Sequence, residues 1–217
     1  MFYVQGMKKI IAVAILITVT LYPVWTAAQN RYAWPIKLTP DLSSRFCDYR
    51  MGHFHAGLDF RTNGKSGYKI YAVDSGFIYR ISMAHNGYGK ALYLKLDNGD
   101  IAVYGHLSSL GKDLDEYARQ VQMKDRKYRQ NLFLDPHQYP VKKGQFIGLT
   151  GSSGSGAPHL HFELRSENNS PINPLKAGFS IKDTTPPVFE KLAVRYYEGN
   201  YNPGSPCRIE LSEIERP

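Results

Sequence analysis

The 217 residues of the chain are enough for one sizeable hydrophobic core and a small additional part. Lys and Arg number 27 against 19 Asp and Glu, which gives a formal net charge of +8 and favours an anionic partner: nucleic acid, a membrane surface or an acidic cell-wall polymer. The basic residues form neither a block nor a nucleic-acid-binding motif, so nucleic acid is excluded as the expected partner.

The first 28 residues are typical of a secretory signal peptide. Met7-Lys8-Lys9 is a short basic region, and residues 10–21 form an apolar run that is too short to span a bilayer comfortably. Thr26-Ala27-Ala28 then offers small residues for cleavage. We therefore predict export to the periplasm or cell envelope. An uncleaved membrane anchor is the alternative, and only in that case do we expect contact with a membrane.

Two cysteines, Cys47 and Cys207, lie beyond the predicted cleavage site. No cysteine directly follows the small residues of the signal, which argues against a lipoprotein anchor. An exported pair can form a disulfide, but whether these two distant cysteines pair does not follow from their spacing.

Two histidines and an aspartate fall close together in residues 49–60. His55 and Asp59 share a face whether this segment is a strand or a helix, because both periods bring i and i+4 to the same side. Gly57 between them indicates a backbone that passes close to another group. A chance cluster in a polar loop is the alternative interpretation.

Residues 68–110 are typical of antiparallel strands joined by tight turns. Asn98-Gly99 is a strong signal for a two-residue hairpin between the last two strands. In the strand before this turn, the leucines should point inward, with Tyr93 and Lys95 outward. The predicted strands cover 68–73, 76–81, 91–96 and 101–106.

His106 lies at the end of the last of these strands, on the face that Ala102 and Tyr104 are expected to share. Functional groups often project from strand ends. A structural histidine is the alternative for a single such residue.

Residues 113–130 interrupt the β pattern with one predicted helix. Asp113 and Glu116 resemble a capping box at its start. Leu114, Tyr117 and Val121 then recur at helical spacing. The helix is thus an insertion between strands, and the β pattern resumes over residues 141–150.

The segment His159-Leu160-His161-Phe162-Glu163-Leu164 predicts a strand with one apolar and one polar face, entered through the Gly/Ser loop 151–158. His159 and His161 should project side by side, whereas Leu160 and Phe162 should face the core. A solvated polar face with two incidental histidines is the alternative.

The character of the chain changes near residue 181. Residues 183–187 are typical of a linker, and residues 188–197 alternate like the first strand of a further β segment, for which an Ig-like fold is one option. We expect a main domain over 29–180 and a linker with the start of a truncated β segment over 181–217. Either the chain is a fragment of a longer protein, or the last residues are a short appendage.

Together the polar residues predict a zinc site. His55, Asp59 and one histidine of the 159/161 pair would supply three ligands, and water the fourth position of a tetrahedron. The other histidine of that pair and His106 would lie beside the water.

Three motifs stand out in the chain: His55-x-Gly57-x-Asp59, Tyr104-Gly105-His106-Leu107 and His159-Leu160-His161-Phe162-Glu163. They resemble those of peptidase family M23, the lysostaphin/LytM-type zinc metalloendopeptidases, in a form similar to those of Gram-negative envelopes. The resemblance covers about residues 42–175, with a long insertion at 111–140 that leaves groove shape and specificity open. Ala157 stands where glycine is common.

The resemblance implies one Zn²⁺ per chain on His55, Asp59 and His161, with His106 and His159 as catalytic residues. Which of these two is the general base stays open. Glu163 is expected to support the metal ligands from behind, or else to pair only with a surface Lys or Arg.

The implied fold is mainly β: an antiparallel sheet with a groove, of the duplicated hybrid motif or barrel-sandwich kind, here with one inserted helix. The implied activity is hydrolysis of peptide cross-links in bacterial peptidoglycan, whose stem peptides and cross-bridges are the expected partner. D-alanyl–diaminopimelate links are favoured over glycine bridges. A non-catalytic module that binds the wall or activates other hydrolases is the alternative.

Overall fold

The computed structural model describes residues 31–50, 52–136 and 138–181, and the backbone of four short strands between residues 191 and 210. The chain divides into two compact units, Met1–Ser180 and Ile181–Pro217. The predicted signal peptide, with its cleavage site and its alternative role as an anchor, lies outside the described residues.

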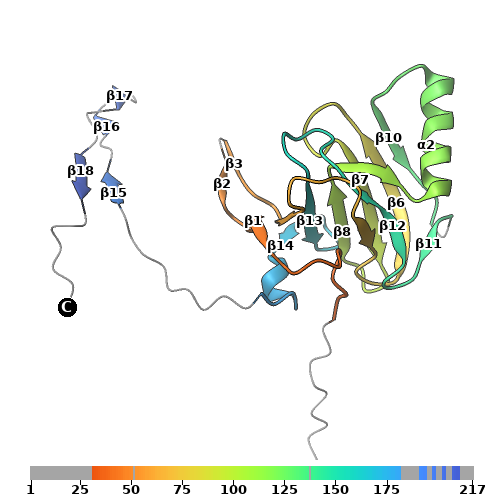
Figure 1. The fold of residues 1–217 in the computed structure, drawn as a ribbon, viewed down its shortest axis with the longest axis horizontal. Coiled ribbons are helices and arrows are strands. Elements are labelled where there is room, and N and C mark those ends of the chain that lie inside the picture. Colours follow the sequence, from red (N-terminus) through yellow and green to blue (C-terminus); the bar gives the residue numbers. More distant parts are fainter. Residues whose placement is uncertain are drawn as a thin grey trace, which may run out of the picture. The chain divides into compact units, whose positions relative to one another are not determined.

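A nine-stranded antiparallel sheet forms the body of the first unit (Figure 1). Its strands follow the spatial order β1-β4-β13-β8-β7-β6-β10, with β14 paired to β13 and β11 paired to β6. The strands are β1 (Leu42–Ser44), β4 (Leu58–Arg61), β6 (Gly76–Met83), β7 (Lys90–Leu96), β8 (Ile101–Gly105), β10 (Gln130–Phe133), β11 (Pro140–Val141), β13 (His159–Arg165) and β14 (Pro171–Ile172).

A smaller sheet and a hairpin complete this unit. The smaller sheet has the order β5-β12-β9 and consists of β5 (Lys69–Tyr71), β12 (Phe146–Thr150) and β9 (Leu107–Leu110). The hairpin joins β2 (Tyr49–Arg50) to β3 (His53–Phe54), and a 3₁₀ turn covers Pro174–Lys176. With a single α-helix among the described residues, the predicted mainly β fold class is confirmed.

The second unit contains two strand pairs: β15 (Lys191–Val194) pairs with β18 (Cys207–Glu210), and β16 (Tyr197–Glu198) pairs with β17 (Asn202–Pro203). Of the two cysteines, Cys47 is free and exposed in the first unit.

One hydrophobic core joins the large and the small sheet, because side chains from both belong to the same buried cluster. Leu160 and Phe162 of β13 face this core and are fully buried, as their alternation with the histidines predicts. Phe162 packs edge-on against Phe179, at 5.3 Å between ring centroids, and near Phe60. Because the apolar side chains of β13 are buried in the core, the histidines and Glu163 of the same strand must point to the opposite face of the sheet.

The opposite face of the large sheet carries a second, smaller apolar cluster. Tyr93 points away from the main core, as predicted, but it is only 3% exposed there. Its ring is covered by the Arg80 guanidinium, 4.3 Å from the ring centroid, and packs against Tyr79. The alternation of β7 is as predicted, but neighbouring strands supply an aromatic cover on this side also.

The inserted helix α2 (Lys112–Asp125) begins directly after β9, with Gly111 as its N-cap and no side-chain cap. The predicted capping box is therefore wrong: Asp113 lies in the first helical turn. The Gly111 N–H donates to the Ile147 carbonyl at 2.9 Å, and this bond ends β9 at that point. The helix therefore begins at Lys112, two residues earlier than a capping box with Asp113 as the N-cap would place it.

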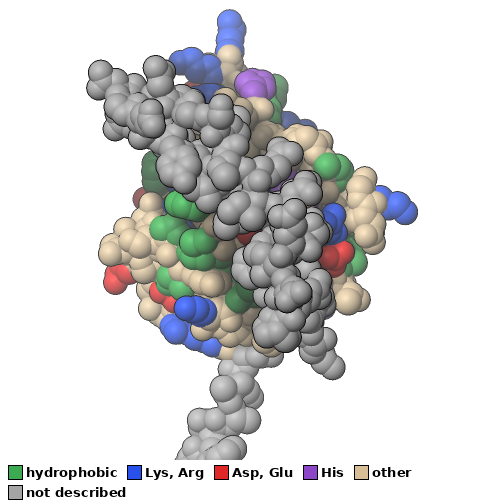
Figure 2. All heavy atoms as spheres, turned by 90° about the vertical axis from the view of Figure 1, so that its left-hand side faces the viewer, with side chains coloured by type: hydrophobic (Ala, Val, Ile, Leu, Met, Phe, Trp, Pro, Cys, Tyr) green, Lys and Arg blue, Asp and Glu red, His purple; other side chains and the backbone are tan. Residues whose placement is uncertain are grey.

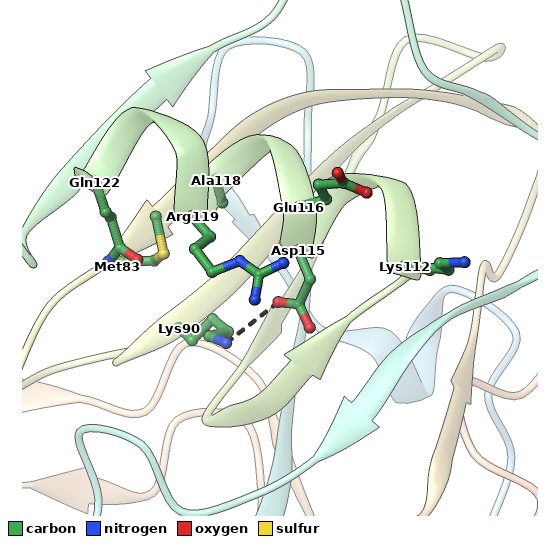
Figure 3. Close-up of a pocket in the computed structure, with 8 residues that line it drawn as sticks. All are labelled: Met83, Lys90, Lys112, Asp115, Glu116, Ala118, Arg119 and Gln122. Atoms are coloured by element: carbon green, nitrogen blue, oxygen red, sulfur yellow. Dashed lines mark hydrogen bonds and ion pairs between the residues drawn. The ribbon is translucent and has the colours of Figure 1, made fainter. Parts of the chain in front are cut away.

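Beside α2 lies a cavity of about 400 Å³ with mixed charges, where Lys90 pairs with Asp115 at 3.3 Å (Figure 3). On the face shown in Figure 2, Lys and Arg side chains are scattered among Asp and Glu, consistent with the spread of charge along the sequence. Within the described part of the chain, no helix has the length and apolar character needed to cross a bilayer.

Candidate metal centre

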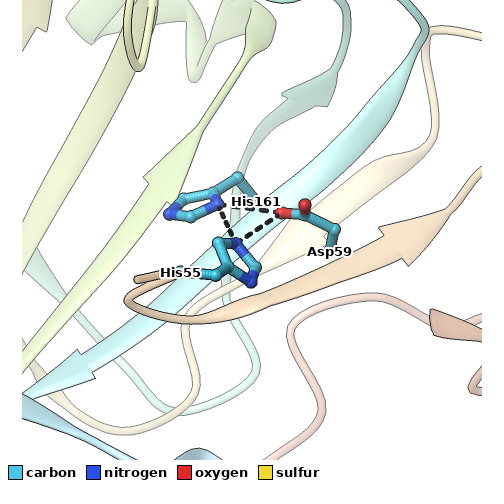
Figure 4. A group of neighbouring side chains, drawn as sticks. All are labelled: His55, Asp59 and His161. Carbon is cyan, nitrogen blue, oxygen red and sulfur yellow. Dashed lines mark hydrogen bonds and ion pairs between the residues drawn. The ribbon is translucent and has the colours of Figure 1, made fainter. Parts of the chain in front are cut away.

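The candidate centre forms where β4 and β13 pair. Asp59 lies directly opposite His161 in this antiparallel pair, and His55 comes just before β4. The chain between them passes so close to β13 that a Cβ on Gly57 would collide with the Phe162 carbonyl oxygen. Glycine at this position therefore allows the close approach that brings the three polar side chains together (Figure 4).

The three side chains meet at one point and are almost withdrawn from water, with 5–6% of each residue exposed. His161 Nδ1 lies 2.8 Å from Asp59 Oδ1 and 3.1 Å from His55 Nε2. The last edge, from His55 Nε2 to Asp59 Oδ1, is 3.1 Å. Zinc bonds of about 2.0–2.2 Å in a tetrahedron put ligand atoms about 3.3 Å apart, so this triangle has the right size.

The hydrogen bonds of the two histidines indicate which ring nitrogens carry lone pairs. His55 Nδ1 donates to the Arg45 carbonyl oxygen at 2.8 Å, which leaves Nε2 unprotonated. His161 Nε2 donates to Glu163 Oε1 at 2.7 Å, which leaves the lone pair of this ring on Nδ1. Two lone pairs and a carboxylate oxygen at about 3 Å repel one another unless a proton or a metal cation lies between them. His55, Asp59 and His161 could therefore hold a metal ion.

The electrostatics at this point favour positive charge. Burial raises the pKa of Asp59, but hydrogen bonds with His161 and His55 outweigh burial and hold the pKa well below its usual range. Burial lowers the pKa of His161, yet the hydrogen bonds to Asp59 and Glu163 raise it overall. The donor set of two imidazoles and one carboxylate matches that of catalytic zinc sites.

Glu163 lies behind His161, on the face that its alternation predicts, and is fully buried. It accepts hydrogen bonds from Tyr88 Oη and from Arg165 Nε, each at 2.6 Å. Burial raises its pKa, but the bonds from His161 and Arg165 lower it to about 2. Glu163 thus remains ionised and orients the His161 ring, whereas Tyr88 and Arg165 are partners that sequence reasoning missed.

His106 and His159 lie beside the three-residue cluster, with their ring centroids 4.6 Å apart. Each Nδ1 is bonded to a backbone carbonyl: His106 to Ser153 at 2.9 Å and His159 to Ala157 at 2.8 Å. In the neutral form each ring therefore has its lone pair on Nε2, and Nε2 of His159 lies 3.6 Å from Asp59 Oδ1. Burial lowers the pKa of His106 to about 4, so this ring is neutral at pH 7.

The placement of His106 differs from the prediction that it shares a face with Ala102 and Tyr104. Those two side chains belong to the core, but His106 has a left-handed backbone with φ of 61° just after β8. This conformation turns its side chain to the other side of the sheet, within 5.7 Å of the His161 ring centroid.

A groove of about 510 Å³ opens over the five histidine and aspartate side chains. One wall is the β2–β3 hairpin with Arg50, and the other consists of the Gly87-Tyr88 turn with Ser155 and Gly156 of the Gly/Ser loop. Arg50 donates from Nη2 to Asp59 Oδ2 at 2.8 Å. Sequence reasoning missed Arg50, because a two-residue strand has no readable alternation.

The fold and this centre together define a β domain with a groove over a candidate metal site. The family model described as peptidase family M23 matches residues 130–174. Residues 130–174, which include His159 and His161, therefore resemble that family.

Two curated relatives are each 28% identical to this chain over the segments that align. The "DD-carboxypeptidase/endopeptidase Mpg" of Neisseria meningitidis serogroup B is 28% identical over 132 residues, 60% of this chain and 24% of that protein. The "Murein hydrolase activator NlpD" of Escherichia coli is 28% identical over 120 residues, 55% of this chain and 25% of that protein. The chain therefore spans about a quarter of the length of these relatives.

Solved structures with a similar arrangement include Helicobacter pylori Csd3, with 30% identity and a TM-score of 0.45 over 72% of this chain and 35% of that one. The catalytic domain of lysostaphin from Staphylococcus simulans is 25% identical, with a TM-score of 0.46 over 63% of this chain and 90% of that domain.

Proposed function

We propose that the chain is an exported zinc metalloendopeptidase that hydrolyses peptide cross-links of bacterial peptidoglycan in the periplasm or cell envelope. The observation that carries the proposal is the triangle of three converging acceptor atoms on His55, Asp59 and His161, at the floor of a groove with two further histidines beside it. The name of the Neisseria relative, a carboxypeptidase/endopeptidase, supports the same class of reaction.

His55 Nε2, Asp59 Oδ1 and His161 Nδ1 would hold the zinc ion. When bound, zinc lowers the pKa of a water molecule to about 7 and polarises the carbonyl of the bond to be cut. Glu163 keeps the proton of His161 on Nε2, so that Nδ1 stays available as a ligand.

The protein's own proton carriers are His106 and His159. Because both Nδ1–H groups are held by backbone carbonyls, each ring presents Nε2 to the groove. One ring accepts a proton as the water attacks and passes it to the leaving amine, and the other stabilises the developing oxyanion when its Nε2 carries a proton. Because burial keeps His106 neutral at pH 7, its Nε2 can accept the proton of the attacking water.

A second candidate function is activation of other wall hydrolases, which the name of the Escherichia coli relative favours for this chain. Such a module needs the groove but has no use for two histidines whose Nε2 atoms are held towards it. The presence of both therefore favours hydrolysis.

The test is zymography of the exported protein on peptidoglycan, with and without a zinc chelator, followed by mass spectrometry of the released muropeptides. We expect a cleared zone that the chelator abolishes and zinc restores, and products with newly freed stem-peptide ends. Absence of clearing by the zinc-loaded protein, with stimulation of an added amidase instead, would establish the activator.

A further inference from the structure

Resting on the proposed function, we infer that Arg50 selects substrates in which the leaving amine carries a free carboxylate on its adjacent carbon. The inference concerns the substrate class of the same groove. It separates cross-links that end on the D-centre of diaminopimelate, where this carboxylate is free, from glycine bridges, where the corresponding carboxyl group forms the next peptide bond.

The β2–β3 hairpin holds Arg50 beside the candidate metal position. Arg50 pairs with His53 across the hairpin. The hairpin is tied to the centre by two backbone bonds around His55: Cys47 N–H donates to the His55 carbonyl at 2.8 Å, and His55 N–H donates to the Asp48 carbonyl at 2.9 Å. A shift of the hairpin would therefore shift a candidate metal ligand with it.

Asp59 lies between the metal position and the guanidinium. Its Oδ1 faces His55 and His161, whereas its Oδ2 accepts from Arg50 Nη2 at 2.8 Å. One carboxylate group therefore separates Arg50 from the place where the scissile carbonyl would be polarised. The substrate carboxylate in question lies only three bonds from that carbonyl carbon.

Arg50 also has guanidinium N–H groups that are not used in its bond to Asp59. Its side chain is 41% exposed and lines the groove. Among the described residues, Asp59 accepts its one side-chain hydrogen bond, and Asp48 lies close enough to interact with its charge, whereas a guanidinium has five N–H donors in a planar fork. Of the described residues that line the groove, Arg50 is the only one with a permanent positive charge. A carboxylate entering beside the metal position would therefore meet a guanidinium already fixed in orientation.

The experiment compares two peptides that differ in one group. Both end in a D-alanyl–D-residue bond, and the leaving residue carries either a free α-carboxylate or the corresponding carboxamide. The value of kcat/KM is measured for each peptide with zinc-loaded wild type, Arg50→Gln, Arg50→Lys and Arg119→Ala. Arg119 is the matched control, because it is an exposed cation on α2 outside this groove.

We expect the wild type to prefer the carboxylate peptide about 10- to 100-fold, the size of one charge-assisted contact. The ratio of the two rates should fall to near 1 in Arg50→Gln, take an intermediate value in Arg50→Lys, which keeps the charge without the fork, and stay unchanged in Arg119→Ala. Because each ratio is taken within one variant, any change in zinc content cancels.

A measurement of peptide binding distinguishes failure of this inference from failure of the proposed function. The dissociation constants of both peptides are measured by calorimetry with the same proteins. If the wild type hydrolyses neither peptide but binds the carboxylate form more tightly in an Arg50-dependent way, the hydrolase proposal fails and the inference stands. A wild-type ratio near 1 in both rate and binding, or a ratio that survives Arg50→Gln, overturns the inference.

Discussion

Leu160 and Phe162 on one face of β13 and His161 and Glu163 on the other are all hidden from water, with exposures of 0%, 0%, 5% and 0%. The apolar pair is held by packing against the core, which is favourable by itself. The polar pair is held by short hydrogen bonds to charged partners, and burial without those partners would be strongly unfavourable. The two faces are thus equally buried for different reasons, apolar packing on one and hydrogen bonds to charged partners on the other. Single substitutions can distinguish these two contributions.

The largest effect is expected where the polar face meets the metal position. His161→Ala should abolish zinc retention and reduce turnover to background, because it removes one of three ligands. Elemental analysis and a peptidoglycan assay measure both losses. His85→Ala is the control, since His85 stacks on Tyr128 outside the groove. Stoichiometric zinc in purified His161→Ala would remove this residue from the ligand set.

The next effect separates ligands from proton carriers on the same surface. His159→Ala and His106→Ala should keep zinc near the wild-type level and each lose turnover by about 10²-fold or more, the usual scale for a general acid or base. Zinc and rate are measured on the same preparations. Zinc loss in His159→Ala equal to that in His161→Ala would show that His159 is also a metal ligand. Near-normal rates in both His159→Ala and His106→Ala would leave the mechanism without a proton carrier.

On the apolar face, the corresponding test is one of stability. Phe162→Ala should lower the free energy of unfolding by about 3–5 kcal/mol, because it removes a fully buried ring and leaves a cavity. Urea denaturation of the metal-free protein measures the change. Phe133→Ala, in which the lost ring is 67% exposed, should cost less than about 1 kcal/mol. Equal losses in the two variants would contradict the assignment of Phe162 to the core.

Glu163→Gln provides a smaller effect with a pH signature that packing cannot produce. The folded pKa of Glu163, about 2, lies below the ordinary value near 4.3, so its ionised form stabilises the fold above pH 4.3 and this contribution is lost as the pH falls towards 2. We expect Glu163→Gln to cost about 3 kcal/mol at pH 7. The difference from wild type, followed by urea denaturation of the metal-free proteins, should shrink below pH 4. A difference independent of pH would indicate a packing defect instead.

The two faces also differ in how far the sequence predicts them. Strict alternation in β13 was enough to place Leu160 and Phe162 in the core and the two histidines together on the other side. It could not predict that the polar face is buried, because Tyr88, which satisfies Glu163 together with Arg165 of the same strand, comes from a turn with no pattern of its own.

The same limit explains the errors elsewhere. Tyr93 alternates as a solvent-facing residue would, yet Arg80 from the neighbouring strand covers it. The face of His106 depends on one left-handed backbone angle, which has no signature in a non-glycine residue. The helix starts at Gly111 because a tertiary contact with Ile147 ends β9 there, so the local capping signal at Asp113 is not used.

The insertion after β9 also governs the behaviour of the protein in concentrated solution. β6, with eight residues, would otherwise have an open edge. β10 pairs with its Arg80–Met83 half, β11 pairs with Gly76 and Phe77, and backbone bonds from Tyr139 and Leu134 fill the gap between them. Long open edges template aggregation. A shortened protein without residues 111–140 should therefore precipitate even where its groove is intact, whereas one that lacks only the helix α2 and keeps these two strands should stay in solution.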